Sequence, residues 1–278
     1  IINDKLIKIN HHNINILSDR DPKNLNWKDF NCKIIIDATG AFLTTEKCLN
    51  HNVDYIIMSA PPKDDTQTFI YGVNEDKYNG ENIISGSSCT TNGLAPILKL
   101  INDNYSIKDI NFTTIHAATA SQYTIDVLKK SSRTNRSILN NIIPHSTGAT
   151  KSINDVLPEL SGKINGTSVR VPVSNCSLID INIILEEENV TLDDIEKLLI
   201  NHKNFGIVYE INKLNLVSSD FITTTTPCIF DKRASMDMKK GKLKLMVWYD
   251  NEWSYSTQLI RLAEHIYNFN KSIKDKYY

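Results

Sequence analysis

The sequence has no cysteine spacing that would build a metal site or a disulfide framework. Its five cysteines are odd in number, and none forms a C-x-x-C pair. Unpaired thiols are typical of proteins in a reducing compartment, so a cytoplasmic protein without a bound metal is expected. The cysteines are Cys32, Cys48, Cys89, Cys176 and Cys228.

Long apolar runs and an excess of one charge are also missing. The run Ile34–Ile36 is far too short to cross a bilayer, and no signal or transit peptide is visible. The 278 residues include 31 basic and 32 acidic side chains, a net charge of −1. This balance gives no general attraction for nucleic acid or an anionic membrane, so neither partner is expected.

What is present is enough apolar sequence, 41% of the chain, for one large or two ordinary domains. In residues 1–88, short apolar strands alternate with helices, which predicts an α/β unit with a largely parallel sheet. The expected strands are Asn13–Leu17, Lys33–Ala38, Asp54–Ala60, Thr68–Val73 and Asn82–Gly86, and the expected helix is Thr44–Asn50.

After residue 88 the strands cluster together, which favours a mostly antiparallel sheet in an α+β unit. The expected strands are Asn111–His116, Thr167–Glu188 (broken near Pro172), Gly206–Ile211, Leu214–Phe221, Cys228–Asp237 and Leu243–Trp248. The expected helices are Ala149–Leu157, Thr191–Asn201 with a capping box from Thr191 to Asp194, and an amphipathic helix near the C-terminus. The polar stretch Ser121–Asn140 has no clear period and is expected to be an extended loop.

Cys89 stands where a thiol is expected to become nucleophilic. Apolar residues at helical spacing follow it through Asp103, and Ser87 or Ser88 is a natural N-cap. A cysteine in the first helical turn is close to free N–H groups and the positive end of the helix dipole, which lowers its pKa. Buried packing is the alternative that the hexapeptide Ser87–Asn92 by itself leaves open.

His116 is the best candidate base for this thiol, because it ends a predicted strand where its side chain can point into a cleft. Ser146-Thr147-Gly148 precedes a predicted helix, whose free N–H groups suit an anion. Arg170 lies among valines in a predicted strand, where a substrate phosphate or a structural ion pair would compensate its charge. Arg136 is a second phosphate candidate, unless it is a solvated surface residue.

Several segments together carry a resemblance to a known family. The order and approximate spacing of the segments match glyceraldehyde-3-phosphate dehydrogenases over essentially the whole chain. Ser87–Pro96 resembles the nucleophile segment of that family, Thr113–Ala117 its histidine strand, and Asn141–Ala149 its phosphate-binding turn. The further matching segments are Ser18–Pro22, Ser59–Pro61, Arg170–Pro172 and Trp248–Trp253.

The resemblance implies a role for each matching position. Cys89 would attack the aldehyde to form a thiohemiacetal and then an acyl-thioester, with His116 moving the proton. The substrates would be glyceraldehyde 3-phosphate and inorganic phosphate, and the cofactor NAD. The residues implied for the two phosphates are Ser88, Thr90, Thr119, Arg136, Thr147, Gly148 and Arg170. Those implied for the cofactor are Arg20, Ser59, Asn251 and Tyr255.

The same resemblance implies the architecture. Residues 1–88 would be the remainder of a doubly wound, Rossmann-like NAD-binding domain that is incomplete here. Residues 89–252 would be the catalytic domain, and the helix in residues 253–278 would pack back on the NAD-binding domain. The loop Ser121–Asn140 looks like the segment that packs across a neighbouring subunit in a homotetramer.

One departure from the family concerns the cofactor. The sequence has no G-x-G-x-x-G turn and no acidic residue after it for the adenosine ribose, so NADP in place of NAD stays possible. Since the chain begins with Ile1 and not Met, it is expected to be a fragment, and expressed alone it is expected to be poorly soluble.

Three alternatives to the leading interpretation remain open. One is an erythrose-4-phosphate dehydrogenase, although Ser146–Ala149 keeps the triose-phosphate form of the turn. The second is a truncated remnant in which Cys89 reacts but no hydride is transferred. The third is a thiol acyltransferase or hydrolase that uses Cys89 and His116 without a cofactor.

Overall fold

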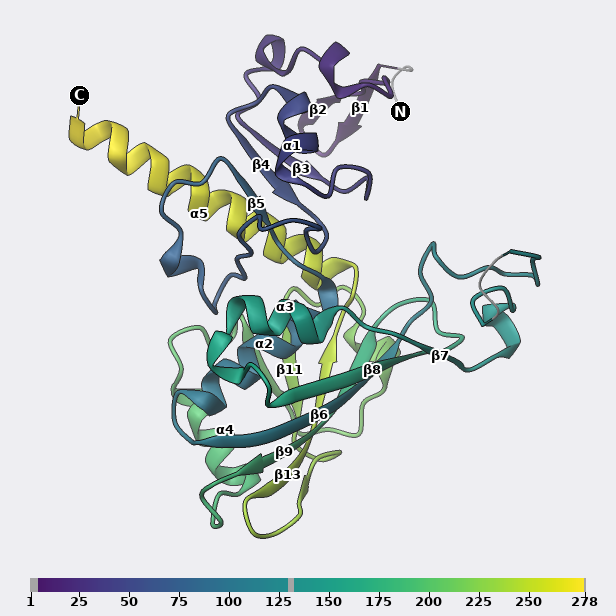
Figure 1. The fold of residues 1–278 in the computed structure, drawn as a ribbon, viewed down its shortest axis with the longest axis vertical. Coiled ribbons are helices and arrows are strands. Elements are labelled where there is room, and N and C mark those ends of the chain that lie inside the picture. Colours follow the sequence, from purple (N-terminus) through teal and green to yellow (C-terminus); the bar gives the residue numbers. More distant parts are fainter. Residues whose placement is uncertain (1–4, 130–132, 278) are drawn as a thin grey trace.

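The computed structural model describes residues 5–129 and 133–277, which form a mixed α/β fold with a small parallel sheet and a large, mostly antiparallel one (Figure 1). The strands are β1 (Leu6–Ile9), β2 (His12–Asn15), β3 (Ile34–Asp37), β4 (Tyr55–Met58), β5 (Ile83–Ser85), β6 (Ile107–His116), β7 (Ile143–His145), β8 (Ile164–Arg170), β9 (Ser177–Leu185), β10 (Tyr209–Asn212), β11 (Cys228–Asp231), β12 (Met236–Asp237) and β13 (Lys242–Tyr249). The α-helices are α1 (Thr45–Cys48), α2 (Cys89–Asn102), α3 (Ala149–Val156), α4 (Leu192–Asn201) and α5 (Trp253–Tyr277). Both fold classes expected from the sequence are confirmed.

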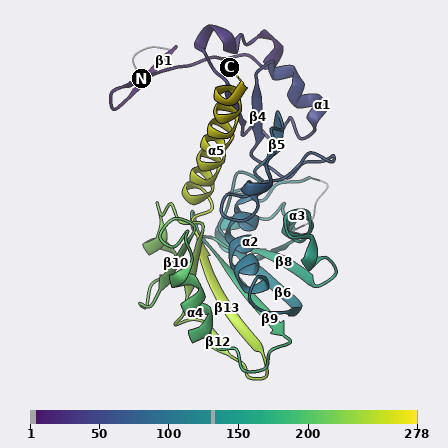
Figure 2. The same cartoon turned by 90° about the vertical axis from the view of Figure 1, so that its left-hand side faces the viewer.

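The small sheet has the order β3-β4-β5, and its neighbouring strands are parallel. Consecutive apolar residues in β4 are buried because a parallel sheet is covered on both faces. Helix α5 covers one face, where Leu259, Leu262 and Ile266 pack with Ile57 and Ile84. This packing places α5 alongside the small sheet, with the start of the helix near the large sheet (Figures 1 and 2).

The large sheet has the order β10-β11-β13-β9-β6-β8-β7, and β12 pairs with β13. Its pairs are antiparallel except β10–β11 and β6–β8. In β9 and β13 alternate side chains are buried, which is the period-2 pattern of a sheet with one covered face. Helix α2 packs against β6, β9, β11 and β13, and α3 packs against β8.

Two strand predictions are wrong and a third strand is shorter than expected, in each case because local turns outcompete the sheet. In Thr68–Val73 only Thr68 makes a bridge, because the N–H of Ile70 donates to Asn74 Oδ1 and the chain then turns at Gly72, where φ is +84°. Leu214–Phe221 contains a 3-10 helix at Ser218–Phe221. Gly206–Ile211 begins as a turn, and the strand spans only Tyr209–Asn212.

The other expected elements are found with small shifts. The Thr191 capping box is confirmed, since the Thr191 N–H donates to Asp194 Oδ2 at 3.1 Å. In the loop 121–140 the described residues are irregular apart from a 3-10 turn at Ile138–Asn140, while residues 130–132 lie outside the described part. Among the helices that the structure describes, none is both long and apolar enough to span a bilayer.

A substitution at Gly166 would test how tightly β6 and β8 pack in the large sheet. A Cβ at this position would lie 2.2 Å from a ring carbon of the buried Phe112, its partner across the β6–β8 pair. Gly166→Ala should therefore lower the free energy of unfolding by about 1–3 kcal/mol through overpacking, measured by urea denaturation. In a Phe112→Leu background the same alanine should cost clearly less; an equal cost in both backgrounds would contradict the stated cause.

Candidate active site

The site begins at the N-terminus of α2, which starts at Cys89. Ser88 is extended, with φ −126° and ψ 163°, and its Oγ accepts a hydrogen bond from the Thr91 N–H at 3.2 Å. This is the N-cap geometry expected from the sequence, and it leaves Cys89 as the first helical residue. The helix is fixed along its length, because its residues from Thr90 to Leu98 are buried.

A strained turn connects β5 to α2. Ser87 is fully buried with φ +60°, a left-handed conformation that is unfavourable for a residue other than glycine. Three hydrogen bonds hold it: Ser87 N–H to Ser85 Oγ, Tyr255 Oη–H to the Ser87 carbonyl, and Asn92 Nδ2–H to the Gly86 carbonyl. These contacts from β5, α5 and α2 fix the direction in which α2 leaves the small sheet.

Cys89 and His116 lie side by side. The Cys89 Sγ is 3.4 Å from His116 Nε2, within the range of a hydrogen bond to sulfur. His116 is the last residue of β6, and Cys89 is the first residue of α2. The strand end and the helix start therefore meet at the edge of the large sheet that faces the small one, and the pairing expected from the sequence is present.

Arg170 contacts the other side of the same imidazole. In the parallel β6–β8 pair, Arg170 is the register partner of His116. Its Nη1 lies 2.7 Å from His116 Nδ1 and 3.1 Å from the Ala117 carbonyl oxygen. The guanidinium is partly buried, its Nε has no hydrogen-bond partner, and no carboxylate pairs with it among the described residues. A structural ion pair, the alternative for Arg170, is therefore not what the structure contains.

Burial dominates the electrostatics of the pair. Burial raises the pKa of the Cys89 thiol above its ordinary value of 9.0, and the Thr90 N–H and the charge of Arg170 offset only part of this increase. Burial and then the Arg170 charge lower the pKa of His116 to about 4. The lowered thiol pKa expected from the helix position alone is wrong, because desolvation outweighs the helix N-terminus. At neutral pH the pair is a thiol beside a neutral imidazole.

Tyr249 supports this pair, although the sequence did not point to a role for it. It is fully buried, and its Oη lies 3.0 Å from Thr90 Oγ1 and 2.8 Å from Thr114 Oγ1. Its ring meets the His116 ring edge to face, with centroids 6.0 Å apart. The alternation of β13 could have indicated that Tyr249 faces the core and that its hydroxyl needs a partner.

Two further clusters connect the proposed cofactor residues to the site. Ser177 Oγ–H donates to Asn251 Oδ1 at 2.7 Å and accepts from the Ala117 N–H at 3.0 Å, which links Asn251 to the residue after His116. Tyr255 interacts with the Ser59 side chain and donates to the Ser87 carbonyl. Asn251, Ser59 and Tyr255 are thereby held around the start of α2.

The remaining expected residues are not hydrogen-bonded to Cys89 or His116. Thr119 bonds Ser121 and Gln122, and Thr147 Oγ1 accepts from the N–H of Ala149. Gly148 is the N-cap of α3. Arg136 is exposed and pairs with Asp126 at 2.9 Å, in a loop that projects from the body of the molecule (Figure 1). Arg20 is exposed and lies beside β3.

A cavity of about 480 Å³ opens at the carboxyl end of β3, lined by Arg20, Trp27, Asp37 and Phe42 among others. Its wall is mostly apolar, yet three buried polar groups in it lack hydrogen bonds: Asp37 Oδ2, Trp27 Nε1 and both ring nitrogens of His51. His51 Nε2 and Asp37 Oδ2 are 3.8 Å apart. Such a cavity combines an apolar wall with a few donors and acceptors that make no hydrogen bond.

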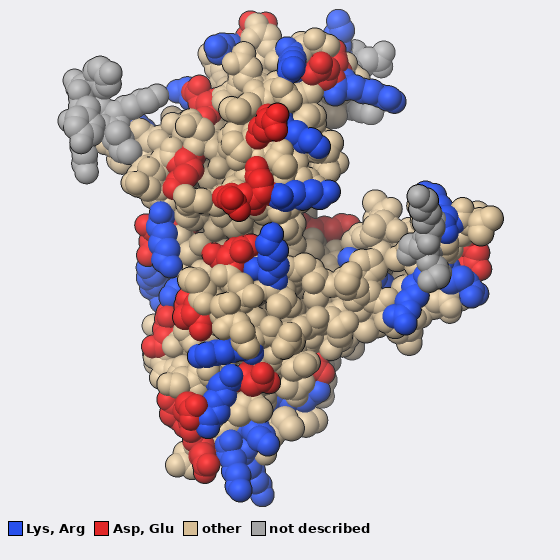
Figure 3. All heavy atoms as spheres, viewed as in Figure 1, with Lys and Arg blue, Asp and Glu red and all other residues tan. Residues whose placement is uncertain are grey.

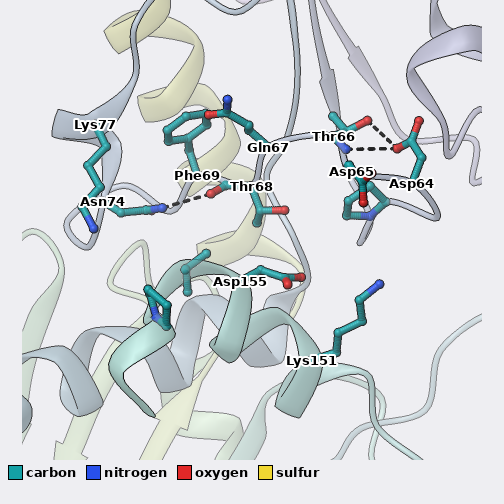
Figure 4. A pocket seen from close by; sticks show the side chains of 13 residues that line it. Asp64, Asp65, Thr66, Gln67, Thr68, Phe69, Asn74, Lys77, Lys151 and Asp155 are labelled. Atoms are coloured by element: carbon teal, nitrogen blue, oxygen red, sulfur yellow. Dashed lines mark hydrogen bonds between the residues drawn. The ribbon is translucent and has the colours of Figure 1, made fainter. Parts of the chain in front are cut away.

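A second cavity of about 400 Å³ lies between the segment 62–77 and α3 (Figure 4). Neither Cys89 nor His116 lines it, and its charged groups are of both signs, as with Asp155 and Lys151. On the face shown in Figure 3, basic and acidic side chains are likewise interspersed. Among the described residues, no group of three or more His, Cys, Asp or Glu could hold a metal ion.

Comparisons with known proteins give a consistent result. A family profile described as "Glyceraldehyde 3-phosphate dehydrogenase, C-terminal domain" matches residues 88–251, and one described as the NAD binding domain of the same enzyme matches residues 1–45. Glyceraldehyde-3-phosphate dehydrogenase of Bacteroides fragilis is 39% identical over 271 residues, covering 95% of this chain and 81% of the relative. Glyceraldehyde-3-phosphate dehydrogenase 1 of Kluyveromyces lactis is 40% identical (93% and 80% covered), and glyceraldehyde-3-phosphate dehydrogenase A of Escherichia coli K12 is 39% identical (95% and 82% covered).

The pKa values of Cys89 and His116 predict the pH dependence of alkylation. The rate at which iodoacetamide modifies Cys89, read by mass spectrometry of its peptide, should still be rising above pH 9, because burial raises the pKa of the thiol. The profile should show no inflection near pH 6.5, because the pKa of His116 is about 4. A rate that levels off below pH 7 would instead indicate a thiolate–imidazolium pair.

Proposed function

The chain belongs to the glyceraldehyde-3-phosphate dehydrogenase family, and from this premise we propose that it converts D-glyceraldehyde 3-phosphate and inorganic phosphate to 1,3-bisphosphoglycerate with NAD. One observation carries the proposal. The Cys89 Sγ lies 3.4 Å from His116 Nε2 at the N-terminus of α2, with the guanidinium of Arg170 beside them. A nucleophile, a base and an anion partner in one place suit an aldehyde that carries a phosphate.

The first step uses the neutral pair directly. His116 Nε2 accepts the thiol proton while the Cys89 sulfur attacks the aldehyde carbon. The imidazolium then protonates the former carbonyl oxygen, so that the product is a thiohemiacetal on Cys89 and His116 is neutral again. A base with a pKa of about 4 takes this proton only as the sulfur bonds to carbon, so proton transfer and attack are coupled. Tyr249 keeps the imidazole in place, because its ring packs against His116 while Thr90 and Thr114 bind its hydroxyl.

The second step converts the thiohemiacetal to a thioester. His116 removes the hydroxyl proton of the thiohemiacetal as its carbon is oxidised. NAD, when bound, would be the oxidant, because its nicotinamide ring can accept a hydride from that carbon. Inorganic phosphate then attacks the thioester carbon, and the Cys89 sulfur leaves and regains a proton from His116.

Two groups of residues are proposed for the phosphates. Arg170 supplies the buried positive charge next to the thiol, and the free N–H groups at the start of α3, after Thr147 and Gly148, supply a second anion site. We extend the proposal, on the family's pattern, to Ser88, Thr90, Thr119 and Arg136. Arg136 lies in the projecting loop and is not in contact with the Cys89–His116 pair of its own chain. Its proposed role therefore requires that the loop reach the site of a neighbouring subunit in a homotetramer.

The residues at the carboxyl edge of the small sheet fit NAD. In open α/β sheets, ligands bind outside the carboxyl ends of the strands. The cavity there offers Trp27 Nε1 and Asp37 Oδ2, neither of which makes a hydrogen bond, and this suits the polar edges of a nucleotide. Arg20 would face the charged or ribose part of the cofactor, and Ser59, Asn251 and Tyr255 would hold its nicotinamide end near Cys89.

We also propose the division of the chain into residues 1–88, residues 89–252 and the helix of residues 253–278. The end of the parallel sheet at Ser85, the start of α2 at Cys89 and the packing of α5 on the small sheet support it. The homotetramer is proposed with it, and the exposed apolar side chains of the projecting loop support a protein contact there. These side chains are Ile125, Leu128 and Leu139, and the exposed Ile142 follows directly after the loop.

NADH formation tests the function. With glyceraldehyde 3-phosphate, NAD and phosphate, the chain should form NADH, measured by absorbance. Cys89→Ser should abolish the reaction because a serine hydroxyl at this place is a far weaker nucleophile, and His116→Gln should slow it about 10²–10⁴-fold by removing the base. Cys32→Ser, a partly buried thiol outside the site, should leave the rate unchanged.

The same assay separates the alternatives. A kcat/KM that is higher for erythrose 4-phosphate than for the triose phosphate would favour erythrose-4-phosphate dehydrogenase. Rapid alkylation of Cys89 without any NADH would favour a reactive-thiol remnant, and thioester hydrolysis without NAD would favour an acyltransferase or hydrolase. Either of the last two results contradicts the proposed oxidation.

A further inference from the structure

His145 is a second histidine beside the active site, and the proposed reaction gives it no role. It ends β7, where it pairs with Ser168 of β8, while Ile143 pairs with Arg170. Directly paired residues share a face of the sheet, as do residues two apart in a strand, so His145 lies on the face that carries Arg170 and, one strand further, His116. Diagonal neighbours in an antiparallel pair are about 7–8 Å apart, within reach of long side chains such as these.

The electrostatics of His116 agree with this placement. Burial lowers the pKa of His116 most, the charge of Arg170 comes next, and the charge that His145 carries when protonated acts in the same direction. His145 is therefore close enough to act on the pair of Cys89 and His116, although it touches neither. Its side chain is partly exposed, so that a small anion from solvent can reach it.

One hydrogen bond fixes the position of the proton in the neutral His145 ring. Nδ1 lies 2.6 Å from the Ser146 carbonyl oxygen, which can only accept a hydrogen bond. Among the described residues nothing else is hydrogen-bonded to this nitrogen, so the contact requires the Nδ1–H form. Nε2 then carries the lone pair, and in the described part of the chain no donor is bonded to it. An acceptor that makes no hydrogen bond thus lies near the Arg170 cation.

An acceptor next to a cation distinguishes oxyanions that carry a hydrogen from those that carry none. The guanidinium of Arg170, whose Nε makes no hydrogen bond, and the N–H groups at the start of α3 can only donate, so they attract phosphate and sulfate alike. Inorganic phosphate keeps one P–OH group even at alkaline pH, and this group can donate to Nε2 of His145. Sulfate has no such hydrogen, and its oxygens would meet Nε2 acceptor against acceptor.

We propose that His145 selects hydrogen phosphate at the anion site beside Arg170, with its Nε2 accepting a hydrogen bond from the P–OH group. The inference rests on the proposed function for the identity of the anion, the inorganic phosphate that attacks the thioester. It adds a specificity-determining residue to that site. With the P–OH group held by His145, the oxygens that carry no hydrogen face Arg170 and the thioester carbon, and the chemical step stays with Cys89 and His116.

Anion binding tests the inference without turnover. The affinities of the full chain for inorganic phosphate and for sulfate are measured by isothermal titration calorimetry at pH 8.5, where both are dianions and imidazole side chains are neutral. The unmodified chain should bind phosphate about tenfold more tightly than sulfate, as expected for one hydrogen bond. His145→Phe, which keeps a ring of similar size, and His145→Ala should bind both anions equally. The matched control His265→Phe, partly exposed on α5 against Tyr78, should keep the preference.

A variant of Arg170 locates the bound anion. Arg170→Gln should weaken the binding of phosphate and sulfate together, because it removes the cation that attracts both. Unchanged phosphate binding in this variant would place the anion elsewhere and overturn the inference. If Arg170→Gln does not fold, the anion preferences of the unmodified chain and of the two His145 variants decide.

The remaining outcomes separate this inference from the proposed function. Equal affinities of the unmodified chain for phosphate and sulfate, or a phosphate preference that persists in both His145 variants, would overturn the role of His145. A chain that prefers phosphate through His145 but forms no NADH would contradict the proposed function and leave the inference standing. NADH formation without a preference for phosphate would overturn the inference alone.

Discussion

The geometry of the site depends on where α2 begins. The Ser88 cap sets the first turn, and the strained Ser87 turn sets the direction in which the helix leaves β5. Because α2 is buried against the large sheet, with α3, α4 and α5 around it, it cannot shift to relieve the strain. The strain at Ser87 is maintained by hydrogen bonds from three different elements, which is how a folded protein holds an unfavourable conformation at a functional position.

The second constraint is the parallel register of β6 and β8. It places His116 and Arg170 side by side at the end of two strands, so a base and a cation share one small volume. Their proximity has an electrostatic consequence: Arg170 favours a thiolate on Cys89 but disfavours a proton on His116. The cation thus favours the neutral form of His116, which leaves one ring nitrogen able to accept a proton.

Burial and helix geometry act on Cys89 in opposite directions. A helix N-terminus lowers a thiol pKa, and the Thr90 N–H contributes in this sense, but removal of the sulfur from water raises the pKa by more. The outcome is a thiol that reacts through a nearby base. The reactivity of this nucleophile therefore depends on His116, whose Nε2 lies 3.4 Å from the sulfur.

The sequence by itself determined the two fold classes, the start of α2 at Cys89, and the residue types of the pair Cys89 and His116, because capping, periodicity and strand clustering are local signals. It failed at Thr68–Val73 and Leu214–Phe221, where an asparagine side chain and a 3-10 turn took the backbone hydrogen bonds that a strand needs. Only the tertiary structure decided the direction of the Cys89 pKa, the role of Tyr249 and the contact of Arg170 with Nδ1. These depend on burial and on the register between strands far apart in the chain, and neither is encoded in the residues nearby.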